Sequence, residues 1–166
     1  MFSMDNLSVP DEIVLDSASH DAPRSLADWV GRVVVLFYES REHLDDNARL
    51  KAEIRRMAAE HPDLAVLAVG DVAAFDFAPV RSIVRSASRA IADRHSLELL
   101  LDWRARLTAA PFGFARDQAN VAILDRDGRI VLRATGALRP GQEERFLVRL
   151  RSVLGDYATM PLAEVA

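Results

Sequence analysis

The residues best suited to chemistry follow directly on a strongly apolar segment. Val33–Tyr38 is an unbroken run of apolar and β-branched residues, which predicts a fully buried strand, and a helical pattern follows it. In open α/β sheets such a strand–helix junction is a usual place for a ligand or an active site. The junction carries seven polar residues: Glu39, Ser40, Arg41, Glu42, His43, Asp45 and Asp46.

Two interpretations of this junction are open. Carboxylates beside a histidine could ligate a metal or act as an acid/base pair; the candidates are Glu42, His43, Asp45 and Asp46. A helix N-terminus, however, carries partial positive charge, which stabilises carboxylates without a cation and repels a metal. We therefore interpret Glu42 and Asp45 as charges of the first helical turn, with Ser40 as the N-cap, and expect no metal site.

A second polar group is expected at the same edge of the sheet. Leu64–Gly70 is another unbroken apolar run, and Asp71 follows it. Glu39 and Asp71 should lie side by side at the carboxyl ends of adjacent parallel strands, with Arg116 approaching from a later loop. This cluster is where a small ligand would bind. The alternative is a solvated network in which Arg116 neutralises the acids.

The composition excludes several functions. The 166 residues include no cysteine, which removes thiolate nucleophiles, disulfides and thiol redox cycling. A net charge of −4 provides no basic field for nucleic acid. No apolar run approaches the roughly 18 residues of a membrane span, and no signal-peptide pattern is present. We therefore expect a cytoplasmic protein with neither nucleic acid nor membrane as a partner. No glycine-rich phosphate loop or catalytic triad spacing occurs, so we expect no cofactor.

Hydrophobic periodicity predicts the elements that position these groups. We expect residues 1–10 to form a flexible arm, 11–155 one domain and 156–166 a tail. Besides the two buried strands, the pattern predicts an edge strand at Ile13–Asp16, helices at Glu42–Glu60, from Pro79 onward and at Pro140–Leu154, a strand at Leu97–Leu101, and a hairpin of Asn120–Asp125 with Ile130–Gly136. This order predicts an α/β three-layer sandwich, a mixed sheet with helices on both faces.

The helix after Pro79 has two distinct faces. Helical spacing predicts that an apolar set faces the core, namely Val80, Ile83, Val84, Ala87 and Ile91. Arg81, Arg85 and Arg89 would then form an exposed stripe of like charges. Either acids of the fold such as Asp76 or Asp93 compensate this stripe, or an acidic protein partner binds it.

These elements in this order resemble the thioredoxin-like superfamily in its redoxin layout. The resemblance rests on the buried strand entering the first helix, on the segment LLLDW after the second helix, and on NVAILDRDGRIVLRATGAL. Val30–Val33, Asn47-Ala48 and Gly136–Leu138 are similar to the bacterial YtfJ type of this superfamily. The family's Cys-x-x-Cys positions fall on Glu42 and Asp45, and its cis-proline position falls at about Ala119, where we expect a trans bond.

The sequence therefore predicts a non-redox thioredoxin-like domain that acts as a protein-interaction or ligand-binding module. A protein partner would be acidic, or the domain would associate with itself. Two alternatives stay open. One is a hydrolase-like enzyme that uses the junction carboxylates and His43, which requires a pocket joining these side chains; the other is a structural subunit of an oligomer. The candidate binding residues are Glu39, Glu42, His43, Asp71, Arg116, Arg81, Arg85 and Arg89.

Overall fold

Nine strands and three α-helices make up the computed structural model, which describes residues 2–3, 7–8, 13–95 and 98–155. The strands are β1 (Phe2–Ser3), β2 (Leu7–Ser8), β3 (Val14–Ser17), β4 (Arg24–Ser25), β5 (Val33–Glu39), β6 (Leu64–Asp71), β7 (Glu98–Asp102), β8 (Asn120–Leu124) and β9 (Arg129–Thr135). The α-helices are α1 (Ala48–Glu60), α2 (Val80–His95) and α3 (Pro140–Leu154), with 3₁₀ turns η1 (Leu26–Trp29), η2 (Arg41–His43), η3 (Ala73–Phe75) and η4 (Arg106–Thr108).

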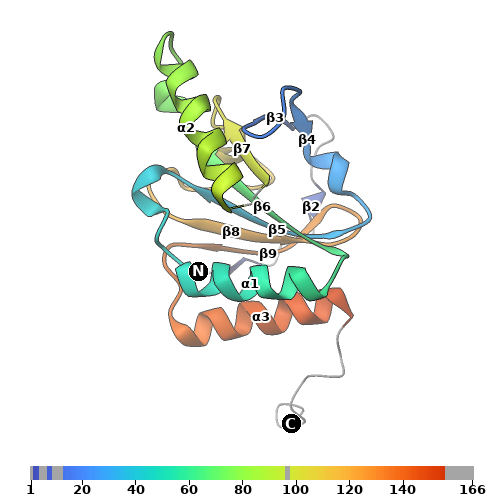
Figure 1. The fold of residues 1–166 in the computed structure, drawn as a ribbon. Helices are drawn as coiled ribbons and strands as arrows, with labels where there is room; N and C mark the ends of the chain where they lie inside the picture. Colours follow the sequence, from blue (N-terminus) through green and yellow to red (C-terminus); the bar gives the residue numbers. More distant parts are fainter. Residues whose placement is uncertain (1, 4–6, 9–12, 96–97, 156–166) are drawn as a thin grey trace, which may run out of the picture.

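The sheet is organised around β5, every residue of which is buried. β5 runs parallel to β6, with Val33 opposite Leu64 and Glu39 opposite Gly70, and β6 runs parallel to β7. On its other side β5 pairs antiparallel with β8, which forms the predicted hairpin with β9. Parallel strands joined through helices, beside an antiparallel hairpin, give the mixed sheet that the sequence predicted (Figure 1).

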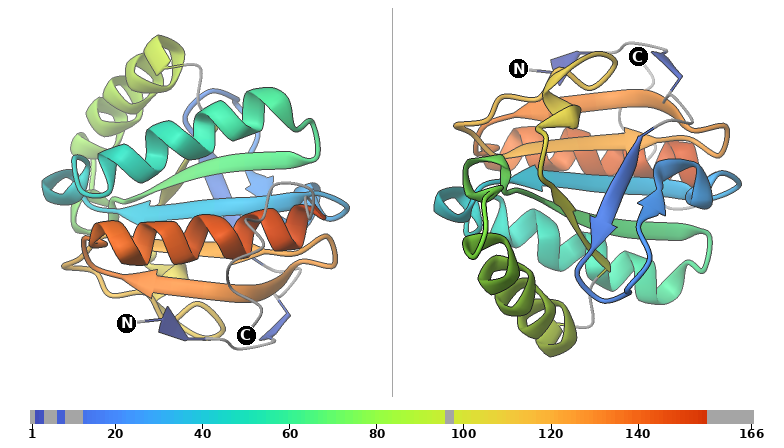
Figure 2. Two further views of the ribbon diagram at one scale, coloured as in Figure 1. Left: turned by 90° about the horizontal axis from the view of Figure 1, so that it is seen from below. Right: turned by 90° about the horizontal axis from the view of Figure 1, so that it is seen from above.

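Alternate residues of β5 divide the core into two layers. Val33, Val35 and Phe37 face α1 and α3, which lie side by side across one face of the sheet (Figures 1 and 2). Val34, Leu36 and Tyr38 face the opposite layer, which is closed by η1, η4 and the segment before β8, and α2 lies on that side at the β7 end. The predicted sandwich with helices on both faces is confirmed.

The first helix begins later than the sequence predicted. α1 starts at Ala48, and its first turn contains no acidic residue. Asn47, in the left-handed conformation with φ of 56°, precedes it. The Asn47 side chain accepts a hydrogen bond from Leu138 N at 2.7 Å and donates one to Gly136 O at 3.3 Å, which ties this turn to the loop before α3. Neither Glu42 nor Asp45 is therefore a first-turn charge of α1; Glu42 lies in the short separate turn η2, after Ser40.

The predicted orientation of α2 is also wrong. Ile83 and Ile91 are 63% and 41% exposed, whereas the buried positions of the helix are Ser88 and Ala92. The small side chains at these two positions allow α2 to lie close to the layer beneath it. The helix is thus turned so that its large apolar residues face outward. The cause is that arginines on its other side pair with acids of the fold.

The N-terminal arm and the peptide bond at Ala119 can also be compared with the sequence prediction. Phe2–Ser3 and Leu7–Ser8 pair with β9, where a flexible arm was predicted. The rest of that arm, residue Leu97 and the 156–166 tail lie outside the described residues. The cis peptide bonds of the described part are Ala78–Pro79 and Ala110–Pro111, so the bond at Ala119 is trans, as predicted. None of the helices described is long and apolar enough to cross a bilayer.

Candidate functional site

Glu39 and Asp71 end adjacent strands, as predicted, but they lie on opposite faces of the sheet. Glu39 is opposite Gly70 in the parallel ladder, so Asp71 is one residue further along β6. Side chains alternate between faces along a strand, which turns Glu39 toward α1 and Asp71 toward the layer of Tyr38. The sequence correctly predicted that both acids lie at the carboxyl ends of adjacent strands. The single ligand-binding cluster predicted there is instead divided into two separate ion pairs.

The first ion pair joins Glu39 to Lys51, the one lysine of the sequence. Lys51 Nζ lies 2.6 Å from Glu39 Oε2 and donates a second hydrogen bond to Leu44 O at 2.8 Å. The two side chains are only 7% and 12% exposed. Burial raises the pKa of Glu39 to about 7, although the hydrogen bond and charge of Lys51 act in the opposite direction. This carboxyl group therefore changes its charge near neutral pH.

The other polar residues of the junction do not join this pair. His43 Nδ1 is 2.9 Å from Asp46 Oδ2, and Glu42 is exposed on η2. Ser40 precedes η2 but makes no capping hydrogen bond through its side chain. The charges of His43 and Asp46 influence the pKa of Glu39 only as minor causes. Within the described residues, no group of three potential metal ligands is present.

The second ion pair, between Asp71 and Arg116, matches the predicted neutralisation. Arg116 donates to both Asp71 oxygens, at 2.8 and 3.1 Å, in the bidentate arrangement that suits a guanidinium group. The Asp71 side chain is 3% exposed, whereas Arg116 is half exposed. Burial, and then the negative charges of Asp71 and Asp102, raise the pKa of Tyr38 beneath this pair. Arg116 thus supplies two charged hydrogen-bond donors to a buried carboxyl group at the sheet edge.

Replacing Arg116 with glutamine is expected to lower the free energy of unfolding by about 1–3 kcal/mol, because Asp71 keeps its burial but loses two charged donors. Urea unfolding monitored by tryptophan fluorescence measures the change. Arg104→Gln is the matched control: Arg104 is exposed in a neighbouring segment, and its replacement should cost less than about 0.5 kcal/mol. Equal effects of the two substitutions would contradict a specific role of the Asp71 pair.

Asn120 holds the loop that carries Arg116. Its side-chain nitrogen donates to Ala115 O at 2.7 Å, Gln118 O at 2.9 Å and Tyr38 O at 3.3 Å. Its oxygen accepts hydrogen bonds from Ala115 N at 3.0 Å and from the Thr135 hydroxyl at 3.2 Å. Asn120 is 1% exposed and therefore fixes the position of residues 115–118 from inside the fold.

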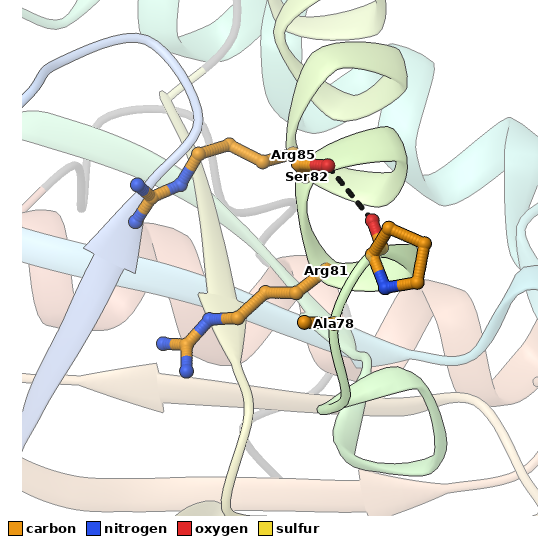
Figure 3. A pocket seen from close by; sticks show the side chains of 5 residues that line it. Ala78, Arg81, Ser82 and Arg85 are labelled. Atoms are coloured by element: carbon orange, nitrogen blue, oxygen red, sulfur yellow. Dashed lines mark hydrogen bonds between the residues drawn. The ribbon is translucent and has the colours of Figure 1, made fainter.

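Among the hollows of the described surface, the two best formed are shallow, and neither joins the predicted catalytic side chains. One, of about 270 Å³, lies at the start of α2 and is lined by Ala78, Pro79, Arg81, Ser82 and Arg85 (Figure 3). The other, of about 470 Å³, lies between α1 and β6 and includes Trp29, Arg55, Ala58 and Glu98. The hydrolase alternative required a pocket joining Glu39, Glu42, His43 and Asp71, and neither hollow provides it.

The arginines of α2 bind acids of the fold itself. Arg85 lies 2.5 Å from Asp16, and Arg81 lies 2.9 Å from Asp76 and 3.4 Å from Asp16. Arg89 pairs with Asp21 at 3.0 Å and donates to Ala18 O at the same distance. Of the two alternatives, compensation by acids of the fold is the one found: Asp76 takes part, as predicted, and β3 and the loop after it supply Asp16 and Asp21. These contacts explain why α2 turns its arginine side inward.

The opposite side of α2 is apolar and exposed. We call the outer face of α2 the set Ile83, Ala87, Ala90 and Ile91, all of them exposed. Phe75 and Phe77, in and after η3, are 43% and 56% exposed. No other described element lies over the outer side of α2 in the views of Figures 1 and 2. Large exposed apolar groups gathered on one element are typical of an interaction surface.

Three features of this region were not predicted from the sequence: the role of Lys51, the role of Asn120 and the outer face of α2. Lys51 stands out as the one lysine beside 20 arginines, yet nothing local connects it with Glu39. Asn120 is the first residue of the buried strand β8, and its position in the sequence does not reveal its five hydrogen bonds. The outer face of α2 carries the very residues assigned to the core, because periodicity separates two faces without saying which is buried.

Comparison with known proteins identifies the fold. No protein-family model matches this chain, and no curated protein matches it. Among solved structures, a candidate thiol:disulfide interchange protein DsbE from Chlorobium tepidum is 18% identical with a TM-score of 0.65, covering 92% of this chain and 100% of that protein. An exposed lipoprotein thioredoxin of Streptococcus pneumoniae is 20% identical with a TM-score of 0.62, covering 84% and 98%.

A third similar structure is BsSco, a member of the Sco family of cytochrome c oxidase assembly proteins, in which a disulfide switch was identified. It is 12% identical with a TM-score of 0.61, covering 90% of this chain and 96% of BsSco. At these identities the likeness shows the fold alone. The chain has the thioredoxin-like fold that the sequence predicted, and it has no cysteine with which to carry out thiol chemistry.

Proposed function

We propose that this chain is a non-redox thioredoxin-like domain that binds protein through the outer face of α2. The observation that carries the proposal is the exposure of Ile83 and Ile91, at 63% and 41%, on a helix three of whose arginines pair with acids of this chain on its other side. Each buried Å² of apolar surface contributes about 25 cal/mol, so covering this face stabilises a complex. The proposal includes the resemblance to the YtfJ type of this superfamily. Similar solved structures support the thioredoxin-like fold itself.

The position of the surface agrees with a binding role. α2 stands at one edge of the molecule, where a partner can approach without disturbing the sheet (Figure 1). η3 contacts α2, so Phe75 and Phe77 add two aromatic side chains near the start of the helix. Aromatic residues are enriched at protein interfaces and depleted at ordinary surfaces. An acidic partner is no longer favoured, because the arginines that would bind it already have partners.

A photo-crosslinking amino acid placed at Ile83 or Phe77 tests this proposal in cells that produce the protein. We expect covalent protein adducts from both positions, because Ile83 lies on the outer face of α2 and Phe77 is exposed immediately before the start of this helix. The matched control is Glu144, which is exposed on α3 at a distance from α2 along the fold, and which should give no adduct. Absence of adducts at Ile83 and Phe77, or equal yields at Glu144, would refute an interaction role for this face.

A further inference from the structure

The sequence of α2 is nearly symmetric about Ala87. Residues 83–91 read IVRSASRAI, so the same residue types recur at equal distances on either side of Ala87. Ile83 corresponds to Ile91, Arg85 to Arg89 and Ser86 to Ser88; the one unequal pair is Val84 with Ala90. A surface that is symmetric in this way has the same chemistry when it is read in either direction.

We infer that the occupant of the outer face of α2 is a second copy of this chain, whose α2 packs antiparallel about a two-fold axis beside Ala87. This inference rests on the proposed function and names the partner for the same surface. In a two-fold interface the same patch is used by both subunits and must be complementary to itself. A helix symmetric about one residue satisfies this requirement when the two copies run in opposite directions.

The side chains of the outer face are compatible with such packing. In the antiparallel pair, Ile83 of one copy lies at the level of Ile91 of the second copy. Val84 lies at the level of Ala90, so that a larger side chain is placed beside a smaller one. Ile83, Ala87 and Ile91 form a ridge of residues four apart, the type of ridge that packs into the grooves of another helix. Ala87 lies at the centre, where a small side chain permits the closest approach.

The charges of α2 do not oppose the association. Arg81, Arg85 and Arg89 are bound to Asp16, Asp76 and Asp21 on the opposite side of the helix. Arg94, the fourth arginine of α2, is exposed near the C-terminal end of the helix. In an antiparallel pair the two copies of Arg94 lie at opposite ends of the contact, so the centre of the contact is formed by apolar residues. Antiparallel alignment also places the partially negative C-terminal end of one helix beside the partially positive N-terminal end of the other, which is favourable.

The size of the surface indicates a weak dimer. α2 has 16 residues and is thus about 24 Å long. A contact along one helix, extended by Phe75 and Phe77, falls at the small end of specific interfaces, below about 1,200 Å² in total. Such contacts are typical of transient association, so we expect a dissociation constant in the micromolar range.

Cysteine substitution gives a direct test, because the natural chain contains no cysteine. Ala87→Cys should form an intermolecular disulfide under mild oxidation, because two copies of the residue face each other across the axis at a separation that a disulfide can span. Asp93→Cys is the matched control: it is exposed on the same helix, but outside the outer face. We expect disulfide formation to be at least about tenfold faster for Ala87→Cys than for Asp93→Cys.

Sedimentation equilibrium of the unmodified protein provides the second measurement. Its mass should rise from 18.4 kDa toward twice that value as its concentration increases to about 100 µM or above. Ile83→Asp should remain monomeric, and its thermal melt should match the natural protein because Ile83 is already exposed. Equal crosslinking rates of the two cysteine variants, or a protein that stays monomeric at about 1 mM, would overturn self-association.

The same experiments separate this inference from the proposed function. If photo-crosslinking at Ile83 captures a different protein while the chain itself stays monomeric, the outer face of α2 is an interaction surface and the second copy is the wrong occupant. If neither photo-adducts nor cysteine crosslinks form at this face, both proposals fail.

Discussion

Replacing Lys51 with methionine is expected to lower the free energy of unfolding at pH 8 by about 2–3 kcal/mol, because the buried Glu39 loses its counterion and must take up a proton to remain inside the fold. Both side chains are nearly inaccessible to water, so solvent cannot replace the lost ammonium group. At pH 5 the penalty should fall to about 1 kcal/mol, since Glu39 is then protonated and only hydrogen bonds are lost. Urea unfolding at the two pH values measures both quantities.

The pH dependence follows from the pKa of Glu39. Its folded-state pKa of about 7 lies above the ordinary value of 4.5. Between these values the folded protein binds more protons than the unfolded chain, so the free energy of unfolding falls as the pH rises. The contribution of Glu39 is fully present below pH 4.5 and is lost as the pH passes through 7, a change of roughly 3 kcal/mol. Comparison with Glu39→Gln isolates this contribution from those of the other carboxylates.

The matched control for Lys51→Met is Arg49→Met in the same helix. The Arg49 side chain is 82% exposed, and its nitrogen lies 3.8 Å from Glu143, so its removal should cost less than about 1 kcal/mol at either pH. A Lys51→Met penalty that is the same at pH 5 and pH 8 would show that Glu39 does not change its charge in this range.

Replacing Asn120 with alanine is expected to destabilise the fold by about 3–5 kcal/mol, because several backbone groups lose their partner inside the protein. Tyr38 O and the amide of Ala115 are among them. The loop carrying Arg116 should loosen at the same time. Amide hydrogen exchange should therefore show lost protection at Ala115, and denaturant unfolding gives the change in stability.

Gln118→Ala is the matched control, because it removes the same carboxamide group from an exposed position of the same loop. It should change the stability by less than about 0.5 kcal/mol. If Asn120→Ala left both the stability and the exchange of Ala115 unchanged, Asn120 could not be the residue that fixes this loop.

Some elements were predictable because their signal is local. β5 and β6 are unbroken apolar runs up to the acidic residue that ends each of them, a pattern typical of strands covered on both faces. The hairpin turns at Gly128, whose φ of 74° suits glycine, and α3 begins at Pro140 and ends before Gly155, as their helix-boundary preferences predict. The start of α1 was predicted wrongly because Asn47 is fixed by contacts with Gly136 and Leu138, about 90 residues away in the sequence.

By itself the sequence determined the arrangement of the central elements and the absence of thiol chemistry, since apolar runs, turn residues and the lack of cysteine act without reference to distant parts of the chain. Tertiary structure alone decided the site. The register of β6 against β5 placed Glu39 and Asp71 on opposite faces, because a shift of one residue reverses the direction of a side chain. Likewise, the sequence of α2 does not decide which of its two faces packs against the rest of the fold. The acids of β3 and its loop lie 60 to 70 residues away in the sequence, and by binding the arginines they left Ile83 and Ile91 exposed.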